Sequence, residues 1–138
     1  MDRIYLMVEF AKNLNEAGRF FGVYGVCLGL EELMLSLSNK NMTTLVNGFN
    51  DEDYVHEIAI NQKLFKNSKL FSIMEYYKSN FVFEKKRMIF IHNSGISPKV
   101  VRENPILKNE INIIGTSKSL NGKEFVSILE HKRYPFYA

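Results

Sequence analysis

The hydrophobic positions at the start of the chain repeat with the period of an α-helix. One apolar stripe is formed by Ile4, Met7, Val8, Ala11 and Leu14. Polar and charged residues occupy the positions between them, as in a helix that buries one face. Gly18 follows the stripe, and glycine is the residue that most often ends a helix. The pattern predicts a helix over residues 3–17 that ends at a glycine cap.

A short extended run and a second helical run come next. Residues 20–26 read FFGVYGV, and this aromatic and β-branched composition favours a short buried strand. Residues 28–37 read LGLEELMLSL, with apolar side chains at helical spacing, and Ser38 supplies a stop signal. Cys27 is therefore predicted to lie on the turn between a strand and a helix.

The middle of the chain has weaker signals. Residues 40–60 are mixed and contain an acidic stretch at 50–53, which suggests a loop. Residues 64–77 are predicted to be helical in parts. Residues 87–91 read RMIFI, a run typical of a buried strand, and His92 follows at its carboxyl end.

The last third of the chain predicts strands. Residues 111–115 and 124–130 have strand character, and Asn121-Gly122 between them is a strong hairpin-turn signal. Ser97-Pro98 opens a turn or a short helix. A helix-strand-helix front followed by a strand-rich back predicts a single α/β domain over residues 1–138, with an antiparallel strand extension.

Composition and charge exclude several classes of function. The chain has 138 residues, 46% of them hydrophobic, which is enough for one globular core. The net charge of +3 is too small to suggest binding to nucleic acid or to an anionic membrane. Charged residues interrupt the first apolar positions, so no secretory signal is predicted in this chain. One cysteine allows no internal disulfide.

Cys27 is the strongest candidate for chemistry. It stands between Gly25 and Gly29 at the predicted strand-to-helix turn, which is the layout of a nucleophile elbow. The turn would expose the sulfur, and the positive end of the helix dipole would stabilise a thiolate nucleophile. The backbone N–H of Leu28 would point to where an oxyanion forms. The alternative is a buried cysteine with glycines present for packing.

Two of the three histidines are predicted to have no role in chemistry. His56 follows the acidic stretch and is expected at the surface or paired with Asp53. His131 lies among charged residues at the end of a strand and is expected to be exposed. Histidine, cysteine and acidic residues show no metal-ligand spacing, so no metal site is predicted.

Several segments closely resemble the gamma-glutamyl hydrolases, peptidase family C26 of the class I glutamine amidotransferase-like superfamily. The segment FFGVYGVCLGLEEL at residues 20–33 resembles the family's active-site segment. Residues 11–18 resemble the helix before it, and residues 91–98, IHNSGISP, look like the family's histidine segment. Residues 124–130 and the Tyr134-Pro135 pair look like the strands that approach the second catalytic residue. Residues 40–86 carry no specific match.

The resemblance implies a flavodoxin-like sandwich of which this chain holds only a part. In the family a His-Pro-Glu segment with the catalytic base follows the Tyr-Pro strand, and the chain stops at Ala138 before such a segment. The upstream strands, with a glycine pair that would complete the oxyanion hole, would lie before Met1. The family is commonly extracellular, lysosomal or vacuolar, and a homodimer is conceivable. No cofactor is implied.

The resemblance also implies roles for two further residues. His92 matches a family histidine at the substrate pocket, so substrate contact is expected; the alternative is a histidine that only orders its own loop. Glu31 lies four residues after Cys27, on the same helix face. In related glutaminases a glutamine occupies this position, so Glu31 is expected to bind the substrate's α-ammonium. A favourable position near the helix N-terminus is the alternative.

The implied reaction is cysteine acyl transfer on folate poly-γ-glutamates. Cys27 would attack the γ-amide carbonyl, and water would hydrolyse the resulting thioester. Two other hypotheses remain open: a glutaminase domain of another class I amidotransferase, and a non-catalytic remnant of the fold. Turnover of glutamine without cleavage of γ-glutamyl peptides would favour the glutaminase.

Overall fold

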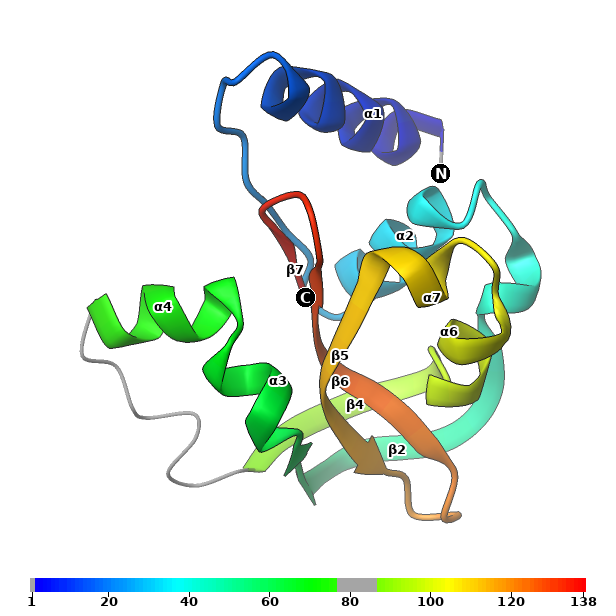
Figure 1. Ribbon diagram of the computed structural model, residues 1–138. Helices are drawn as coiled ribbons and strands as arrows, with labels where there is room; N and C mark the ends of the chain where they lie inside the picture. Colours follow the sequence, from blue (N-terminus) through cyan, green and yellow to red (C-terminus); the bar gives the residue numbers. More distant parts are fainter. Residues whose placement is uncertain (1, 77–86) are drawn as a thin grey trace.

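The computed structural model describes residues 2–76 and 87–138 (Figure 1). The helices are α1 (Asp2–Glu16), α2 (Leu28–Leu37), the 3-10 turn η1 (Met42–Thr44), α3 (Gln62–Lys66), α4 (Lys69–Tyr76), α6 (Pro98–Glu103) and α7 (Leu107–Glu110). The strands are β1 (Val23–Tyr24), β2 (Val46–Glu57), β3 (Ala59–Ile60), β4 (Arg87–Gly95), β5 (Ile111–Lys118), β6 (Glu124–His131) and β7 (Phe136–Tyr137).

The strands form a mixed sheet and a separate ribbon. The five-stranded sheet has the order β1-β7-β6-β5-β3, and β2 pairs with β4 in a two-stranded antiparallel ribbon. In the larger sheet β1 and β7 are parallel, and the other pairs are antiparallel. The predicted α/β class with an antiparallel extension is confirmed, and the arrangement is consistent with part of a flavodoxin-like amidotransferase fold.

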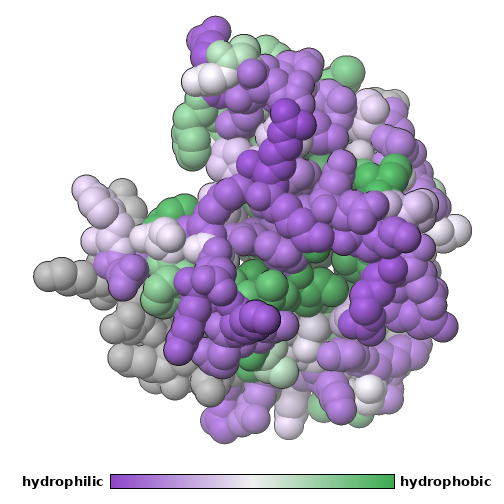
Figure 2. Space-filling model, in the orientation of Figure 1, coloured by the Kyte–Doolittle hydropathy of each residue, from purple (hydrophilic) through white to green (hydrophobic). Residues whose placement is uncertain are grey.

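Helices cover both faces of the sheet. In Figure 1, α3 and α4 lie to the left of the strands, and α2, α6 and α7 lie to the right. Alternate residues of a strand point to opposite faces. Leu129 accordingly packs in a core cluster with α1 and α2, whereas Ile128 packs in a second cluster with α3 and α4. Figure 2 shows that the face toward the viewer is largely hydrophilic, with hydrophobic side chains visible near its centre.

Local signals explain the first helix and its connection to β1. Gly18 has φ +75°, and the Arg19 N–H donates to the Leu14 carbonyl over 2.9 Å, which closes α1 as a glycine cap does. The predicted helix over residues 3–17 is thus confirmed to within a residue at each end. Asn15 then holds the connection, because its side chain donates to the Phe21 carbonyl and accepts from the Phe21 N–H.

The predicted hairpin is also confirmed. Strands β5 and β6 pair in antiparallel register, and Gly122 in the turn has φ +81°, a conformation that favours glycine. Ser97 caps α6 by accepting from the Lys99 N–H, with Pro98 at the first helical position, as the Ser97-Pro98 pair suggested.

The prediction for the β2–β4 region was partly wrong. The acidic stretch at residues 50–53 belongs to strand β2 and is not a loop. His92 lies inside β4, which continues to Gly95, so the histidine does not mark the end of the strand. Pairing with a distant partner strand extends both elements beyond what their local composition indicates. Strand β1, by contrast, is shorter than predicted, since only two of the seven residues from 20 to 26 form a strand.

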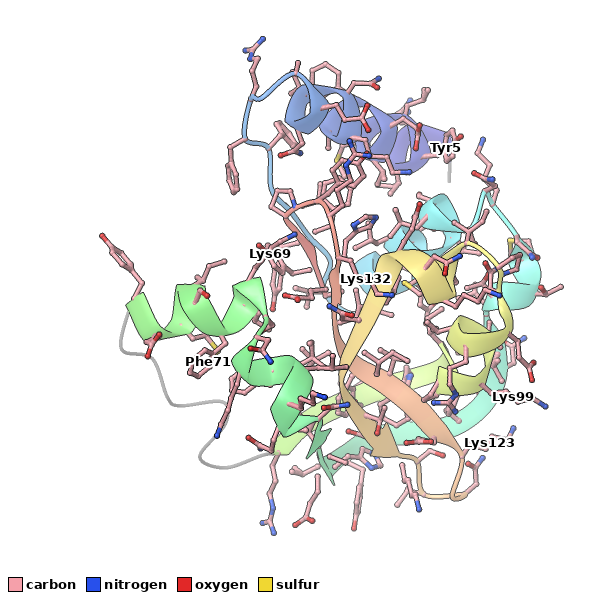
Figure 3. All side chains as sticks on the ribbon, in the orientation of Figure 1. Tyr5, Lys69, Phe71, Lys99, Lys123 and Lys132 are labelled. Atoms are coloured by element: carbon pink, nitrogen blue, oxygen red, sulfur yellow. The ribbon has the colours of Figure 1, made fainter. Side chains whose placement is uncertain are left out.

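Hydrogen bonds of two charged side chains, Lys69 and Glu130, fix the start of α4. The Lys69 ammonium donates to the carbonyl oxygens of residues 132 and 133 at 3.0 and 2.9 Å, with those of 131 and 134 slightly farther away (Figure 3). The buried Glu130 carboxylate accepts from the Leu70 N–H at 3.3 Å, a favourable place for an acid at a helix N-terminus. These contacts attach the start of α4 to the end of β6 and to the loop that follows it.

His131 is buried, contrary to the predicted exposure. Its side chain is 2% exposed, and its Nδ1 accepts from the backbone N–H groups of Arg133 and Tyr134. Its Nε2 lies 3.5 Å from a carboxylate oxygen of Glu110. Burial, and next the positive charge of Lys12, lower the pKa of His131 from 6.5 to about 4. The ring thus accepts hydrogen bonds from the backbone of the following turn. The charged residues next to His131 in the sequence gave no indication of this role.

The low pKa of His131 predicts a fold that weakens in mild acid. The unfolded chain takes up the proton near pH 6.5 and the folded chain only near pH 4. Stability should therefore be full above about pH 7 and should fall as the pH drops through this window. Between about pH 7 and about pH 5 the expected loss is about 2 kcal/mol, measured by urea denaturation.

A His131→Asn variant provides the control. The asparagine side-chain oxygen can accept from the same backbone N–H groups but does not titrate in this range. The variant should lose most of the pH dependence between about pH 7 and about pH 5. An equal loss of stability in both proteins would assign the effect to other groups.

Candidate functional site

Cys27 occupies a strained turn between β1 and α2. It is the N-cap of α2, with φ 55° and ψ −116°, and it is exposed. A non-glycine residue rarely adopts a positive φ, and such strain gathers at functional positions. The turn is closed by hydrogen bonds of 2.9 Å from Gly29 N–H to the Val26 carbonyl and from Leu30 N–H to the Cys27 carbonyl. The exposure of Cys27 therefore contradicts the alternative prediction that it is a buried packing residue.

The two glycines that flank Cys27 have different roles. A Cβ atom on Gly25 would stand 2.5 Å from the Gly29 oxygen and 3.0 Å from the Leu30 nitrogen, so only glycine fits where the strand end meets the helix. A Cβ atom on Gly29 would meet nothing within 4 Å. A side-chain clash therefore explains the glycine at position 25, and no such clash explains the glycine at position 29.

Leu28 is the first residue of α2, and its side chain is exposed. Backbone N–H groups in the first turn of a helix have no carbonyl partner within the helix. The next two N–H groups, of Gly29 and Leu30, are engaged in closing the turn. The Leu28 N–H is thus positioned at the amino end of the helix directly after the sulfur-bearing residue.

Cys27 opens into a pocket of about 270 Å³, which we call the Cys27 pocket. Residues from the β1–α2 turn, α2, α4, β4, β6 and β7 line it. Cys27, Glu31 and His92 all contribute to its wall, so three predicted site residues, two of them 65 positions apart, are brought together. Much of the remaining wall is apolar and includes Leu30 and Met74. Leu28 is not among the described lining residues.

Ser94 connects two of these side chains and was not predicted. Its hydroxyl donates to the Glu31 carboxylate, with the oxygens at 2.9 and 3.1 Å. Phe90, His92 and Ser94 alternate with more exposed neighbours along β4, so they share the inward face. The period of two from His92 to Ser94 is the available signal, but the composition of residues 87–91 predicts a strand that ends before both residues.

His92 is held in one orientation by its surroundings. Its Nδ1 lies 2.8 Å from the Ser94 carbonyl oxygen, which can only accept, so Nδ1 carries a proton in the neutral ring. The ring stacks on Phe49 at an interplanar angle of 10° and packs edge-to-face with Phe125, with the two ring centroids 4.5 Å apart. The hydrogen bond to Ser94 is the kind of local contact expected of a histidine that orders its own segment. The ring also lines the pocket, as expected of a histidine that contacts a substrate.

The other two histidines are buried but do not line this pocket as the structure describes it. His56 is 5% exposed and is surrounded by the rings of Tyr54, Phe90 and Phe125, so its predicted surface position was wrong. Neither His56 nor His131 is among the described lining residues of the Cys27 pocket. Both are instead packed against aromatic side chains.

The described residues hold neither a candidate metal cluster nor a candidate membrane span. Within residues 2–76 and 87–138, histidine, cysteine and acidic side chains nowhere form a group of three or more that could hold a metal ion. In the same part of the chain, no helix has the length and apolar character needed to cross a membrane.

Comparison with known proteins points to one group of enzymes. No protein-family model matches the chain. Gamma-glutamyl hydrolase B of Dictyostelium discoideum is 31% identical over 138 residues, which cover 96% of this chain and 38% of that protein. The gamma-glutamyl hydrolase of Rattus norvegicus is 33% identical over 95% of this chain and 40% of its own length.

A plant relative agrees with these matches. The probable gamma-glutamyl hydrolase 3 of Arabidopsis thaliana is 30% identical over 90% of this chain and 35% of its own length. The chain thus spans between 35% and 40% of the length of these relatives. The resemblance inferred from the sequence motifs is confirmed: along nearly all of its length, this chain is a relative of the gamma-glutamyl hydrolases.

Proposed function

We propose that this chain carries the nucleophile and part of the substrate pocket of a cysteine hydrolase that cleaves γ-glutamyl bonds. The observation that carries the proposal is the exposed Cys27, held at φ 55° at the start of α2 and opening into a pocket. The similarity to proteins named gamma-glutamyl hydrolase supports the bond type. The folate poly-γ-glutamates remain the substrate class that the resemblance implies.

The proposed reaction has two steps. The Cys27 sulfur attacks the γ-amide carbonyl carbon, and the Leu28 N–H donates to the oxyanion of the tetrahedral intermediate. The carbon–nitrogen bond then breaks, the thiol proton reaches the departing amine through a histidine, and a γ-glutamyl thioester remains on Cys27. Water attacks the thioester, the acid leaves, and the thiol is restored.

The topology suggests where the proton-transferring histidine would enter. Strands β1 and β7 are parallel neighbours, so their carboxyl ends lie at the same edge of the sheet. Cys27 follows β1, and Ala138, which follows β7, also lines the Cys27 pocket. Residues attached after Ala138 would therefore begin at the pocket that Cys27 lines. This agrees with the expected position of the His-Pro-Glu segment in the family.

A glutaminase is the second candidate function. The observation that favours it is the Glu31 carboxylate in the pocket wall, which could pair with the free α-ammonium of glutamine. In a folate poly-γ-glutamate each α-nitrogen is part of an amide and carries no charge. The substrates of the two candidate functions therefore differ in the group that would face Glu31.

A substrate panel tests the proposal. The chain would be assayed alone and as a chimera in which it replaces the matching segment of the Rattus norvegicus relative, 40% of that protein. We expect the chimera to cleave γ-glutamyl peptides and to release the amine product, measured by chromatography. Turnover of glutamine without cleavage of γ-glutamyl peptides would establish the glutaminase instead. A folded chimera that turns over neither would indicate a non-catalytic remnant.

A further inference from the structure

Four consecutive backbone carbonyls converge on the ammonium of Lys69. The Nζ atom lies 3.4, 3.0, 2.9 and 3.3 Å from the carbonyl oxygens of residues 131, 132, 133 and 134. Lys69 is the first residue of α4, and the four carbonyls belong to the end of β6 and to the turn that follows it (Figure 3). We call the carbonyls of residues 131–134 the carbonyl cage.

Two side chains determine how this turn is folded. The N–H groups of Arg133 and Tyr134 donate to His131 Nδ1 at 3.0 and 3.1 Å. Within the part of the chain that the structure describes, no backbone N–H donates to the carbonyls of residues 132–134. The N–H groups of the turn thus have the His131 ring as their partner, and the carbonyls have Lys69.

The carbonyl cage has the chemistry of a cation site. A lysine ammonium has three N–H donors, so it cannot give each of the four carbonyls a separate hydrogen. The attraction is instead that of one positive charge for the negative ends of four dipoles. Rings of backbone carbonyls replace the water around K⁺ in the same way in potassium channels. Ammonium and K⁺ have similar sizes, whereas Li⁺ is much smaller and tetramethylammonium is larger and has no N–H.

A buried acid adds negative charge next to the cage. Glu130, the residue before the first cage carbonyl, is 3% exposed. Its carboxylate accepts from the N–H of Leu70, the residue after Lys69. A positive charge in the cage is therefore favoured by this carboxylate as well as by the carbonyl dipoles.

Lys69 joins two parts of the wall of the Cys27 pocket. Leu70 and Met74 of α4 form one part, and Tyr137 and Ala138 at the end of β7 form another. The helix α4 begins at Lys69, and the turn that carries the cage leads into β7. The contact between ammonium and cage therefore sets the position of the α4 wall relative to the strand that ends at the pocket.

We propose that the carbonyls of residues 131–134 form a site for a monovalent cation of the size of ammonium or K⁺, and that Lys69 fills this site and thereby positions the α4 wall of the Cys27 pocket. An external ammonium or K⁺ ion binds in the cage when the Lys69 side chain is removed. The positioning role rests on the proposed function of the pocket, whereas the cation site does not.

Removing the Lys69 side chain and supplying a cation tests the site. Lys69→Ala of the full chain would be unfolded in urea at about pH 8, where His131 is neutral, in lithium, tetramethylammonium, ammonium or potassium chloride at equal concentration. In the first two salts we expect the unfolding equilibrium constant to be about threefold to tenfold above that of the parent. Ammonium and K⁺ should lower the constant by the factor 1 + [cation]/Kd.

Two proteins control for general effects of salt. The parent has its cage filled by Lys69 and should show no additional stabilisation by ammonium or K⁺. Lys132→Ala removes an ammonium from the same turn, but that ammonium donates to one carbonyl only, at Lys108, over 2.9 Å. This variant should respond to the four salts as the parent does.

The sulfur of Cys27 reports on the α4 wall. Cys27 is the only cysteine of the chain, so a thiol reagent modifies one site. N-phenylmaleimide and N-methylmaleimide share the reactive ring, and the ratio of their rates measures how well the pocket holds an apolar group. The ratio should be higher in the parent than in the unfolded chain, because Leu70 and Met74 line the pocket. In Lys69→Ala it should fall about twofold to threefold in lithium chloride and recover with ammonium or K⁺.

Each outcome decides one part of the inference. An equal response of Lys69→Ala to all four salts overturns the cation site, and so does a variant that stays unfolded in every salt. Cation-dependent stability with an unchanged maleimide ratio overturns the positioning role. An inactive chimera in the substrate panel would count against the hydrolase alone, because neither of these measurements involves turnover.

Discussion

Replacing Cys27 by alanine is expected to reduce the γ-glutamyl hydrolase activity of the chimera by at least about a thousandfold. The described pocket wall contains no other thiol, because Cys27 is the only cysteine of the chain. Without the sulfur, the pocket could still bind a substrate but could not form the thioester. The loss should therefore appear in kcat and hardly in the affinity for γ-glutamylglutamate.

Cys27→Gly is the control for strain. Alanine keeps the unfavourable backbone conformation at φ 55°, whereas glycine adopts it without a steric penalty. The glycine variant should be more stable than the alanine variant by about 1 kcal/mol in urea denaturation, although both are inactive. Residual activity of the alanine variant within tenfold of the parent would exclude Cys27 as the nucleophile.

Replacing Gly25 by alanine is expected to cause the largest loss of stability. The new Cβ would stand 2.5 Å from the Gly29 oxygen and 2.7 Å from the Gly29 carbonyl carbon, both of them backbone atoms that cannot rotate away. The end of β1 and the start of α2 would have to separate, and the hydrogen bonds that close the turn would lengthen. The expected cost is about 2–4 kcal/mol, measured by urea or thermal denaturation.

Gly29→Ala is the matched control, because it adds the same methyl group on the other side of Cys27. A Cβ at this position meets nothing within 4 Å, and alanine is the better helix former. We expect Gly29→Ala to be neutral or to stabilise the chain by up to about 1 kcal/mol. Equal destabilisation by the two substitutions would contradict the close approach at Gly25.

Elements with strong local signals were predicted well. The helices over residues 3–17 and 28–37 and the β5–β6 hairpin have their causes within a few residues: an apolar stripe, a glycine cap and an Asn-Gly turn. The turn at Cys27 was located for the same reason, because it lies where a strand pattern changes to a helix pattern. Such signals act between neighbours in the chain.

Elements that depend on a distant partner were predicted poorly. β4 continues through His92 to Gly95 because β2 pairs with it, and the acidic stretch at 50–53 is extended for the same reason. His131 was expected in solvent, because charged residues flank it in the sequence. In the fold its ring is enclosed by Tyr134 and Phe136, and the following turn hydrogen-bonds to it.

The sequence by itself determined the helix that presents Cys27, the hairpin and the relation to the gamma-glutamyl hydrolases, because each of these depends on short, contiguous segments of the chain. Only the tertiary structure decided which flanking glycine is required, that His56 and His131 are buried, and that Ser94 holds Glu31. The physical reason is that each of these depends on distances between atoms brought together by folding. A Cβ contact at 2.5 Å and a hydrogen bond across 63 positions leave no pattern in the sequence.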